Sequence, residues 1–203
     1  MRYAPGHRQA TKSRILHAAG RRFRAMGYGG IGVDGLAQDA GVTSGAFYGH
    51  FRSKAEAFRE AVVAGMEELR EAVISFREEH GRSWIARFTS FYFGPKLQCE
   101  MEEGCALPSL SPEVSRGGED VRRAFEAQVT DIAAIIADGL PEPRSGEMTR
   151  QDCAWVMLAL MSGGTTLARA VYDEAKAAEI ARAVSRAVAA LDAPLVDNAL
   201  NAD

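Results

Sequence analysis

The sequence has 203 residues, 47% of them hydrophobic and 25% charged, which is ordinary for a soluble globular protein with a sizeable core. This length accommodates one domain, or a small domain fused to a larger one. The three cysteines form no CxxC pair, which argues against a disulfide framework or a zinc site and favours a reducing setting. No apolar run approaches the ~20 residues of a membrane span, and residues 1–8 do not resemble a signal peptide. We therefore expect a cytoplasmic protein without a membrane partner.

The charges are distributed unevenly along the chain. Residues 1–54 contain nine Lys/Arg and two acidic residues, a net charge of +7, and the remaining residues carry −10. A basic N-terminal part on an acidic remainder suggests a polyanionic partner that is bound at one end only. On charge alone, the alternative of charged helix faces that are simply solvated stays open.

The hydrophobic spacing predicts helices along nearly the whole chain. Thr11 is the candidate N-cap of a first helix that ends at Gly27, and a short helix is expected over about 33–40. Thr43 and Ser53 are candidate caps of the next two helices. The later segments, in chain order, are the end of a long helix at Gly81, a helix ending near Pro95, an irregular acidic connection over 96–106, a short helix after Pro108, a helix after Gly117-Gly118, a loop over 141–146, and helices over about 150–172 and 174–191. The predicted fold is all-α, with about nine helices.

Gly27, Gly29 and Gly32 match the dinucleotide-binding pattern GxGxxG. That pattern binds pyrophosphate only where it links a strand to a helix. Here the preceding segment is predicted to be helical and no βαβ unit surrounds it. We interpret the glycines as a helix–helix connector and expect no nucleotide cofactor.

The sequence offers little that suggests catalysis. The four histidines, His7, His17, His50 and His80, show neither HxxxH nor HExxH spacing, and there is no GxSxG elbow or Walker loop. We therefore expect no enzyme activity, no catalytic residues, no metal site and no cofactor.

Residues 36–54 have the features that a helix-turn-helix requires. Two short helices meet at a tight turn, with Gly41 just after the first and Thr43 capping the second. The apolar side chains expected to be buried against the first helix are Leu36, Val42 and Phe47. The second helix is expected to present outward Thr43, Ser44, Tyr48 and Gly49. Short hydrogen-bonding groups of this kind suit phosphates and base edges in a major groove.

This segment resembles the DNA-binding signature of the TetR family of repressors. The matching residues are Gly41-Val42 at the turn, the polar pair Thr43-Ser44, Gly45, the run Phe47-Tyr48-x-His50-Phe51, and Ser53-Lys54. The resemblance extends back through residues 15–19, Phe23 and Gly27-Tyr28, and covers about the first 55 residues in order. The rest of the chain resembles the family in helix count and spacing.

By position, the resemblance implies that Tyr48 donates to a phosphate and that Lys54 contacts the DNA backbone from the start of the next helix. Thr43 and Ser44 are expected at phosphates or base edges, and His50 at a phosphate or in the packing. The full set of expected DNA-binding residues is Thr43, Ser44, Gly45, Tyr48, Gly49, His50 and Lys54. Phe47 and Phe51 are expected in the core.

Two residues depart from the family pattern. Gly49 lies where family members commonly have a larger base-reading side chain, so specificity is expected to depend on Thr43, Ser44, DNA shape and a basic N-terminal arm around Arg8. Arg22 lies on the apolar side of the first helix, where it either reaches toward phosphate or covers the edge of the core.

The resemblance implies a three-helix DNA-binding domain over 1–53, a helical regulatory and dimerisation domain over 54–192, and a tail over 193–203. One short recognition helix reads few base pairs, so such domains act in two-fold pairs on palindromic operator DNA. The candidate homodimer interface is Val156, Leu160, Gly163, Leu167, Ile180, Val184 and Val188. The alternative is that these residues of the last two predicted helices pack only within their own chain.

An effector pocket is expected among the large, adaptable side chains of the middle helices. The candidate lining residues are Met66, Trp84, Phe88, Tyr92, Cys105, Phe125, Trp155 and Met161. The effector itself is unknown, and the low number of buried charges favours a hydrophobic one. Cys105 is either a reactive thiol that senses electrophiles or oxidants, or a small buried hydrophobe, and the second reading is favoured.

Together these features predict a ligand-responsive transcriptional regulator, and repression is preferred because the family mostly represses. The alternative within DNA binding is a sequence-independent architectural protein. The acidic remainder of the chain argues against that alternative, because it does not favour broad coating of DNA.

Overall fold

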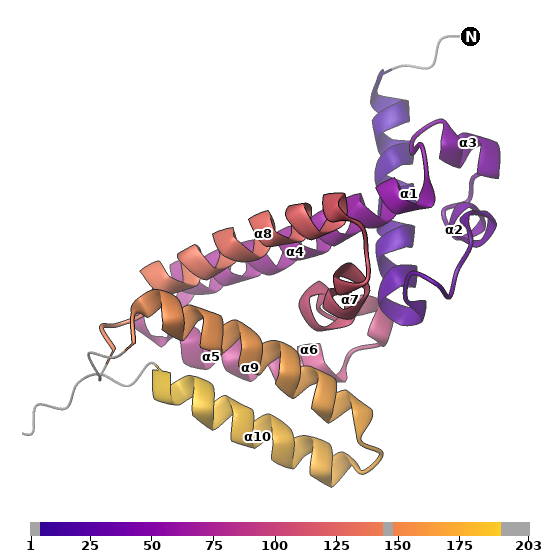
Figure 1. Ribbon diagram of the computed structural model, residues 1–203. Coiled ribbons are helices and arrows are strands. Elements are labelled where there is room, and N and C mark those ends of the chain that lie inside the picture. Colours follow the sequence, from indigo (N-terminus) through magenta and orange to yellow (C-terminus); the bar gives the residue numbers. More distant parts are fainter. Residues whose placement is uncertain (1–4, 144–147, 192–203) are drawn as a thin grey trace, which may run out of the picture. The chain divides into compact units, whose positions relative to one another are not determined.

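The computed structural model describes residues 5–143 and 148–191, and within them the chain is helical without any strand (Figure 1). This confirms the predicted all-α fold. The α-helices are α1 (Pro5–Met26), α2 (Val33–Asp39), α3 (Ser44–Tyr48), α4 (Lys54–His80), α5 (Trp84–Tyr92), α6 (Pro95–Gln98), α7 (Ala106–Ser115), α8 (Glu119–Asp138), α9 (Arg150–Ala170) and α10 (Glu174–Leu191), and the short 3-10 helices are η1 (Gly81–Ser83) and η2 (Met101–Glu103). The predicted tail over 193–203 and part of the predicted loop over 141–146 lie outside the described residues.

The described residues form two compact units. The first contains residues 5–69 and 99–129, and the second contains 70–98, 130–143 and 148–191. The boundary between α4 residues Leu69 and Arg70 lies inside one helix. The division at residue 53 into a DNA-binding and a regulatory domain is a division by function, and it stays a prediction.

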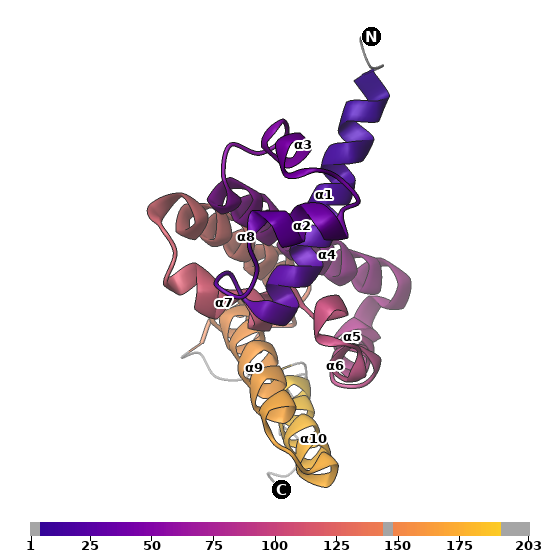
Figure 2. The ribbon, with the colours of Figure 1, turned by 90° about the vertical axis from the view of Figure 1, so that its right-hand side faces the viewer.

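In the first unit, α2 and α3 pack against α1 around an aromatic core (Figures 1 and 2). Phe23, Phe47 and Phe51 have at most 1% of their surface exposed, and the rings of Phe23 and Phe58 meet edge to face with centroids 5.1 Å apart. Large buried aromatic rings supply most of the apolar area that such a small three-helix unit can bury. This core fixes the face of α3 that is turned outward.

The predicted helix ends are largely confirmed. Gly27 and Gly41 have φ angles of 70° and 65°, left-handed conformations that end α1 and α2 and that favour glycine. Thr43 caps α3 by accepting a hydrogen bond from the Ala46 backbone N at 3.1 Å. Ser53 accepts from the Glu56 backbone N at 3.1 Å at the start of α4.

Two boundary predictions were wrong, both next to a proline. α1 begins at Pro5, so Thr11 lies inside the helix and does not cap it. Residues 96–106 are not irregular throughout, because they contain most of α6, all of η2 and the first residue of α7. Pro95 is the first residue of α6 and Pro108 lies in the first turn of α7. A proline costs little there, because the first-turn N–H groups have no partner inside the helix.

In the second unit, α9 and α10 lie side by side (Figures 1 and 2). Gly164 of α9 permits this closeness, since a Cβ added there would lie 2.9 Å from a methyl carbon of Val184 on α10. Thr149 and Asp152 form a reciprocal capping box at the start of α9. The core of this unit includes Trp84, whose Nε1 donates to the Gly139 carbonyl at 3.0 Å.

Candidate nucleic-acid interface

The outward face of α3 is small and polar. Thr43, Gly45 and Gly49 are exposed, and Tyr48 has 56% of its surface exposed. Phe47, between these positions, is completely buried. The arrangement gives α3 one anchored side and one free side, as the sequence predicted for a recognition helix.

The two hydroxyl groups at the start of α3 have different hydrogen-bond partners. Thr43 Oγ1 accepts a bond from the Ala46 backbone N at 3.1 Å. Ser44 Oγ donates to Asp34 Oδ1 of α2 at 2.5 Å. Asp34 was not among the predicted site residues. The only sequence signal was an acidic residue in the first turn of the first helix of the motif.

Arg8 contacts the end of the recognition helix. Its Nη2 donates to the Gly49 carbonyl oxygen at 3.3 Å. Arg8 lies inside α1, so the basic N-terminal arm that the sequence suggested around it is helical from Pro5 onward. Within the described residues, Arg8 therefore supports the C-terminal end of α3 from α1.

His50 follows α3 and is half-buried. Burial is the main reason that its pKa is lowered from 6.5, and the positive charges of Arg8 and Lys12 lower it further. The neutral imidazole is thus favoured in the free protein. A neutral imidazole still donates one hydrogen bond, so its position suits a phosphate contact as well as packing.

Lys54, the first residue of α4, is held by an aromatic ring. Its Nζ lies 4.3 Å from the centroid of the Tyr28 ring. A cation over an aromatic face is attracted by the quadrupole of the ring. Tyr28 thus positions the lysine that the sequence predicted to contact the DNA backbone. In the sequence, Tyr28 was noted only as part of the resemblance, and nothing in its spacing indicated this contact.

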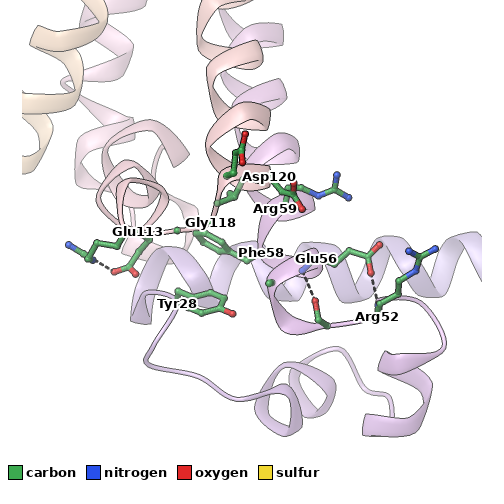
Figure 3. Close-up of a pocket in the computed structure, with 14 residues that line it drawn as sticks. Tyr28, Arg52, Glu56, Phe58, Arg59, Glu113, Gly118 and Asp120 are labelled. Atoms are coloured by element: carbon green, nitrogen blue, oxygen red, sulfur yellow. Dashed lines mark hydrogen bonds and ion pairs between the residues drawn. The ribbon is translucent and has the colours of Figure 1, made fainter.

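A cavity of about 820 Å³ opens beside the start of α4 in the first unit (Figure 3). Tyr28 and Phe58 lie on one side of it, and several acidic and basic groups surround it. Glu56 accepts from the Arg52 backbone N at 2.5 Å, and Glu113 pairs with Arg116 at 2.8 Å. Glu56 and Glu113 are thus engaged by neighbouring groups of the protein.

Arginines at the end of α1 bind the η2 segment of the first unit. Arg22 pairs with Asp39 of α2 and, at 3.0 Å, with Glu102. Arg21 pairs with the same Glu102 carboxylate, and buried Arg24 donates from Nε to the Glu102 carbonyl at 2.8 Å. Arg22 is thus held in ion pairs in the free protein, and the two alternatives for it, a phosphate contact or the edge of the core, stay predictions. The side-chain hydrogen bond from Arg22 is also the main reason that the pKa of Asp39 is lowered.

Comparisons with known proteins match this arrangement. A sequence profile described as bacterial regulatory proteins of the tetR family matches residues 15–61. The chain is 25% identical over 169 residues to an uncharacterised HTH-type transcriptional regulator of Lactococcus lactis subsp. lactis, covering 80% of this chain and 85% of that protein. It is 27% identical over 170 residues to the HTH-type transcriptional repressor NemR of Escherichia coli K12, covering 78% and 84%. Residues 15–61 therefore match the DNA-binding region of the tetR family, and most of the chain is similar to named transcriptional regulators.

Solved structures support the same fold. The crystal structure of the reduced form of E. coli NemR aligns with a TM-score of 0.78 at 21% identity, covering 92% of this chain and all of that one. A TetR-family regulator from Agrobacterium tumefaciens aligns with a TM-score of 0.71 at 18% identity, covering 89% and 98%. The matched relatives are named as HTH-type regulators, and the chain is a helix-turn-helix transcriptional regulator that resembles the TetR family.

The predicted effector-pocket residues fall in both units. Met66, Cys105 and Phe125 lie in the first, and the second contains Trp84, Phe88, Tyr92, Trp155 and Met161. Most are buried, but Phe125 lines an open cavity of about 720 Å³ and Trp155 is exposed. The residues that line a larger cavity of about 1070 Å³ in the second unit include Phe93 and Leu97, and they belong to a different set. A pocket formed by the predicted residues stays a prediction.

Cys105 is 8% exposed and lies at the N-cap position of α7, where its side chain makes no capping bond. This burial is what the reading as a small hydrophobe requires. The reading as a reactive sensor requires access for an electrophile or oxidant.

The residues of the candidate homodimer interface differ in their exposure. Val156, Gly163 and Leu167 are exposed on α9, and Leu167 has 60% of its surface free. Val184 packs near Gly164, and Val188 on α10 is completely buried within the single chain. Leu160 and Ile180 are half-buried. The α9 members are therefore the part of the predicted interface that a second chain can reach.

Over residues 5–143 and 148–191, no helix is long and apolar enough to cross a membrane. The same residues contain no group of three or more His, Cys, Asp or Glu side chains arranged to hold a metal ion.

Proposed function

We propose that this TetR-family regulator is a repressor that binds palindromic operator DNA as a homodimer and is released by a small, mostly hydrophobic effector. The observation that carries the proposal is the outward face of α3, which presents Thr43 and Tyr48 beside glycines at positions 45 and 49. Small residues allow the backbone to approach DNA closely, and hydroxyl groups bind phosphates and base edges. Lys54 and Arg8 flank this face from α4 and α1.

The proposed dimer uses the exposed apolar side of α9. Trp155, Val156 and Leu167 are 39%, 36% and 60% exposed, and Tyr172, just after α9, is fully exposed. Val156 and Leu167 are about three turns apart and share one face of α9, and apolar side chains on a shared face mark an interaction surface more often than isolated ones do. Two copies of one helix-turn-helix give the two-fold symmetry that a palindromic operator requires.

The proposed effector is mostly hydrophobic with at least one polar group. In the second unit, Thr89 and Thr165 are 5% and 4% exposed, and their hydroxyl oxygens have no hydrogen-bond partner among the described residues. A buried hydroxyl without a partner is costly, so a ligand that supplies one gains affinity. Sequence reasoning missed both threonines, because the position of a threonine along a helix does not show whether its hydroxyl group is hydrogen-bonded.

Fluorescence anisotropy of labelled DNA from immediately upstream of the gene, with scrambled DNA as the control, tests the proposal. We expect preferential binding to the upstream DNA at near-physiological salt, and Tyr48→Phe is expected to weaken it by about 3- to 10-fold through loss of one phosphate hydrogen bond. Ser83→Ala is the control, because it also removes one exposed hydroxyl group but lies in the second unit, outside the proposed DNA-binding and dimer residues. Equal loss in both variants, or equal affinity for both DNAs on this and on selected sequences, would contradict the proposal.

A further inference from the structure

Two hydroxyl-bearing residues begin the recognition helix, and each has a defined hydrogen-bond direction. The Oγ1 atom of Thr43 accepts from the Ala46 backbone N at 3.1 Å, so its own proton is free to donate. The hydroxyl of Ser44 donates its proton to Asp34 Oδ1 at 2.5 Å. Neighbouring residues on one helix thus offer opposite hydrogen-bonding groups to a partner.

The direction of the Ser44 bond follows from the chemistry of its partner. A carboxylate accepts hydrogen bonds and does not donate them, and a serine hydroxyl has one proton. With that proton given to Asp34, Ser44 Oγ can only accept from anything else. Phosphate oxygens of DNA are acceptors, so Ser44 in this state does not suit the phosphate contact that its position first suggested.

The remaining partner for an acceptor on this face is a donor on a base edge. In the major groove, cytosine presents the N4 amino group and adenine the N6 amino group, whereas guanine O6 and thymine O4 are acceptors. Asp34 is exposed and its Oδ2 atom adds a second acceptor next to Ser44. Guanine O6 or thymine O4 at this place would face two acceptors, one of them charged, which is unfavourable.

The carboxylate also opposes non-specific binding. Every phosphate carries a negative charge, and the affinity for non-specific DNA depends mainly on charge. An exposed Asp34 on α2, the first helix of the motif, lowers that affinity, and a good contact with an amino group offsets the loss on the correct sequence.

We propose that Asp34 fixes Ser44 as a hydrogen-bond acceptor and that the pair selects a base with an exocyclic amino group, cytosine or adenine, at one position of each operator half-site. The inference rests on the proposed function, since it needs α3 to enter the major groove. It assigns a specificity role to an acidic side chain that otherwise only weakens the attraction to DNA.

Selection from a pool of random double-stranded DNA, followed by sequencing, tests the inference with the full-length protein. We expect the unmodified protein to enrich one half-site position for cytosine or adenine. Asp34→Ala frees the Ser44 proton, and the preference at that same position is expected to fall by about tenfold while the other positions are unchanged. Ser44→Ala is expected to relax the same position, and the double variant is expected to relax it no further, because the two residues act as one unit.

Glu126→Ala is the matched control. It removes one exposed carboxylate from α8 in the same unit, where Glu126 lines a cavity that contains no residue of α2 or α3, and it is expected to leave every base preference intact. Circular dichroism melting of each variant shows that the helix-turn-helix is folded. If the unmodified protein enriches a sequence that Asp34→Ala also enriches without change, or if the affected position prefers guanine or thymine, the inference is wrong and the proposed function stands. If the unmodified protein enriches no sequence, both fail.

Discussion

His50 shows how one residue can report on DNA binding. In the free protein its pKa is lowered, first by burial and then by the charges of Arg8 and Lys12. Phosphate groups act in the opposite direction, because a nearby negative charge stabilises the imidazolium form. If His50 contacts a phosphate, its pKa rises when DNA binds, and association takes up a proton between the two pKa values.

The affinity for DNA is expected to increase as the pH falls through the window between the lowered pKa of the free protein and the higher pKa of the complex. Lowering the pH from about 7.5 to about 5.5 is expected to strengthen binding by about 3- to 10-fold, and His50→Gln is expected to remove that part of the change. Anisotropy titrations over this range measure it, with His80→Gln as the control. A pH profile that His50→Gln leaves unchanged would place His50 in the packing instead.

At the scale of helices, the ends were more predictable than the contacts between helices. Thr43, Ser53, Gly27 and Gly41 have local signals, because capping and left-handed turns depend on a few neighbouring residues. Prolines misled the prediction over 96–106, since a proline in a first turn and a proline that ends a helix look alike in sequence.

Contacts between distant residues had no such local signal. The bond between Ser44 and Asp34, the Tyr28 ring under Lys54, and the arginines that bind Glu102 each join different elements. Sequence spacing places a residue on a helix face, but the partner of that face depends on tertiary packing. For this reason the α3 face could be predicted, whereas the polar network that orients it could not.

The packing of α9 on α10 gives a prediction for neighbouring glycines. A Cβ at position 164 would lie 2.9 and 3.0 Å from the two Val184 methyl carbons, so Gly164→Ala is expected to lower the free energy of unfolding by about 1–3 kcal/mol. Adding Val184→Ala should recover part of that loss. Urea denaturation followed by circular dichroism measures both.

Gly163→Ala is the control for the same helix. A Cβ there meets no atom of the chain within 4 Å, so the change is expected to be neutral or to stabilise the single chain by about 0.5–1 kcal/mol. Any loss caused by Gly163→Ala should depend on protein concentration, since it would come from the proposed dimer. A loss for Gly164→Ala no larger than that for Gly163→Ala would contradict the packing argument.

At the scale of the whole molecule, charge and exposed apolar surface separate two tasks. Residues 1–54 carry +7 and the rest carries −10, so DNA attraction belongs to the N-terminal part. The exposed apolar residues of α9 offer the surface for self-association. Both features were visible in the sequence, because charge and helical periodicity need no tertiary information, whereas the burial of Val188 within one chain needed the structure.

Leu167 tests the proposed dimer. Leu167→Glu places a charge on a residue that is 60% exposed, so it should leave the fold intact while burial in an interface becomes unfavourable. We expect the variant to sediment as a monomer and to lose most of its affinity for a palindromic site. Ala127→Glu adds the same charge at an exposed position of α8 and should leave the dimer unchanged. An unchanged sedimentation coefficient for Leu167→Glu would exclude this face as the interface.

The proposed function requires that two recognition helices read one two-fold DNA site. The most direct measurement compares, by anisotropy, the affinity for a selected palindromic site with the affinity for the same site after one half is scrambled, together with the stoichiometry at saturation. We expect two chains per intact site and a loss of about 100-fold or more in affinity when one half is scrambled. Equal affinity for the intact and half-scrambled sites, or one chain per intact site, would contradict it.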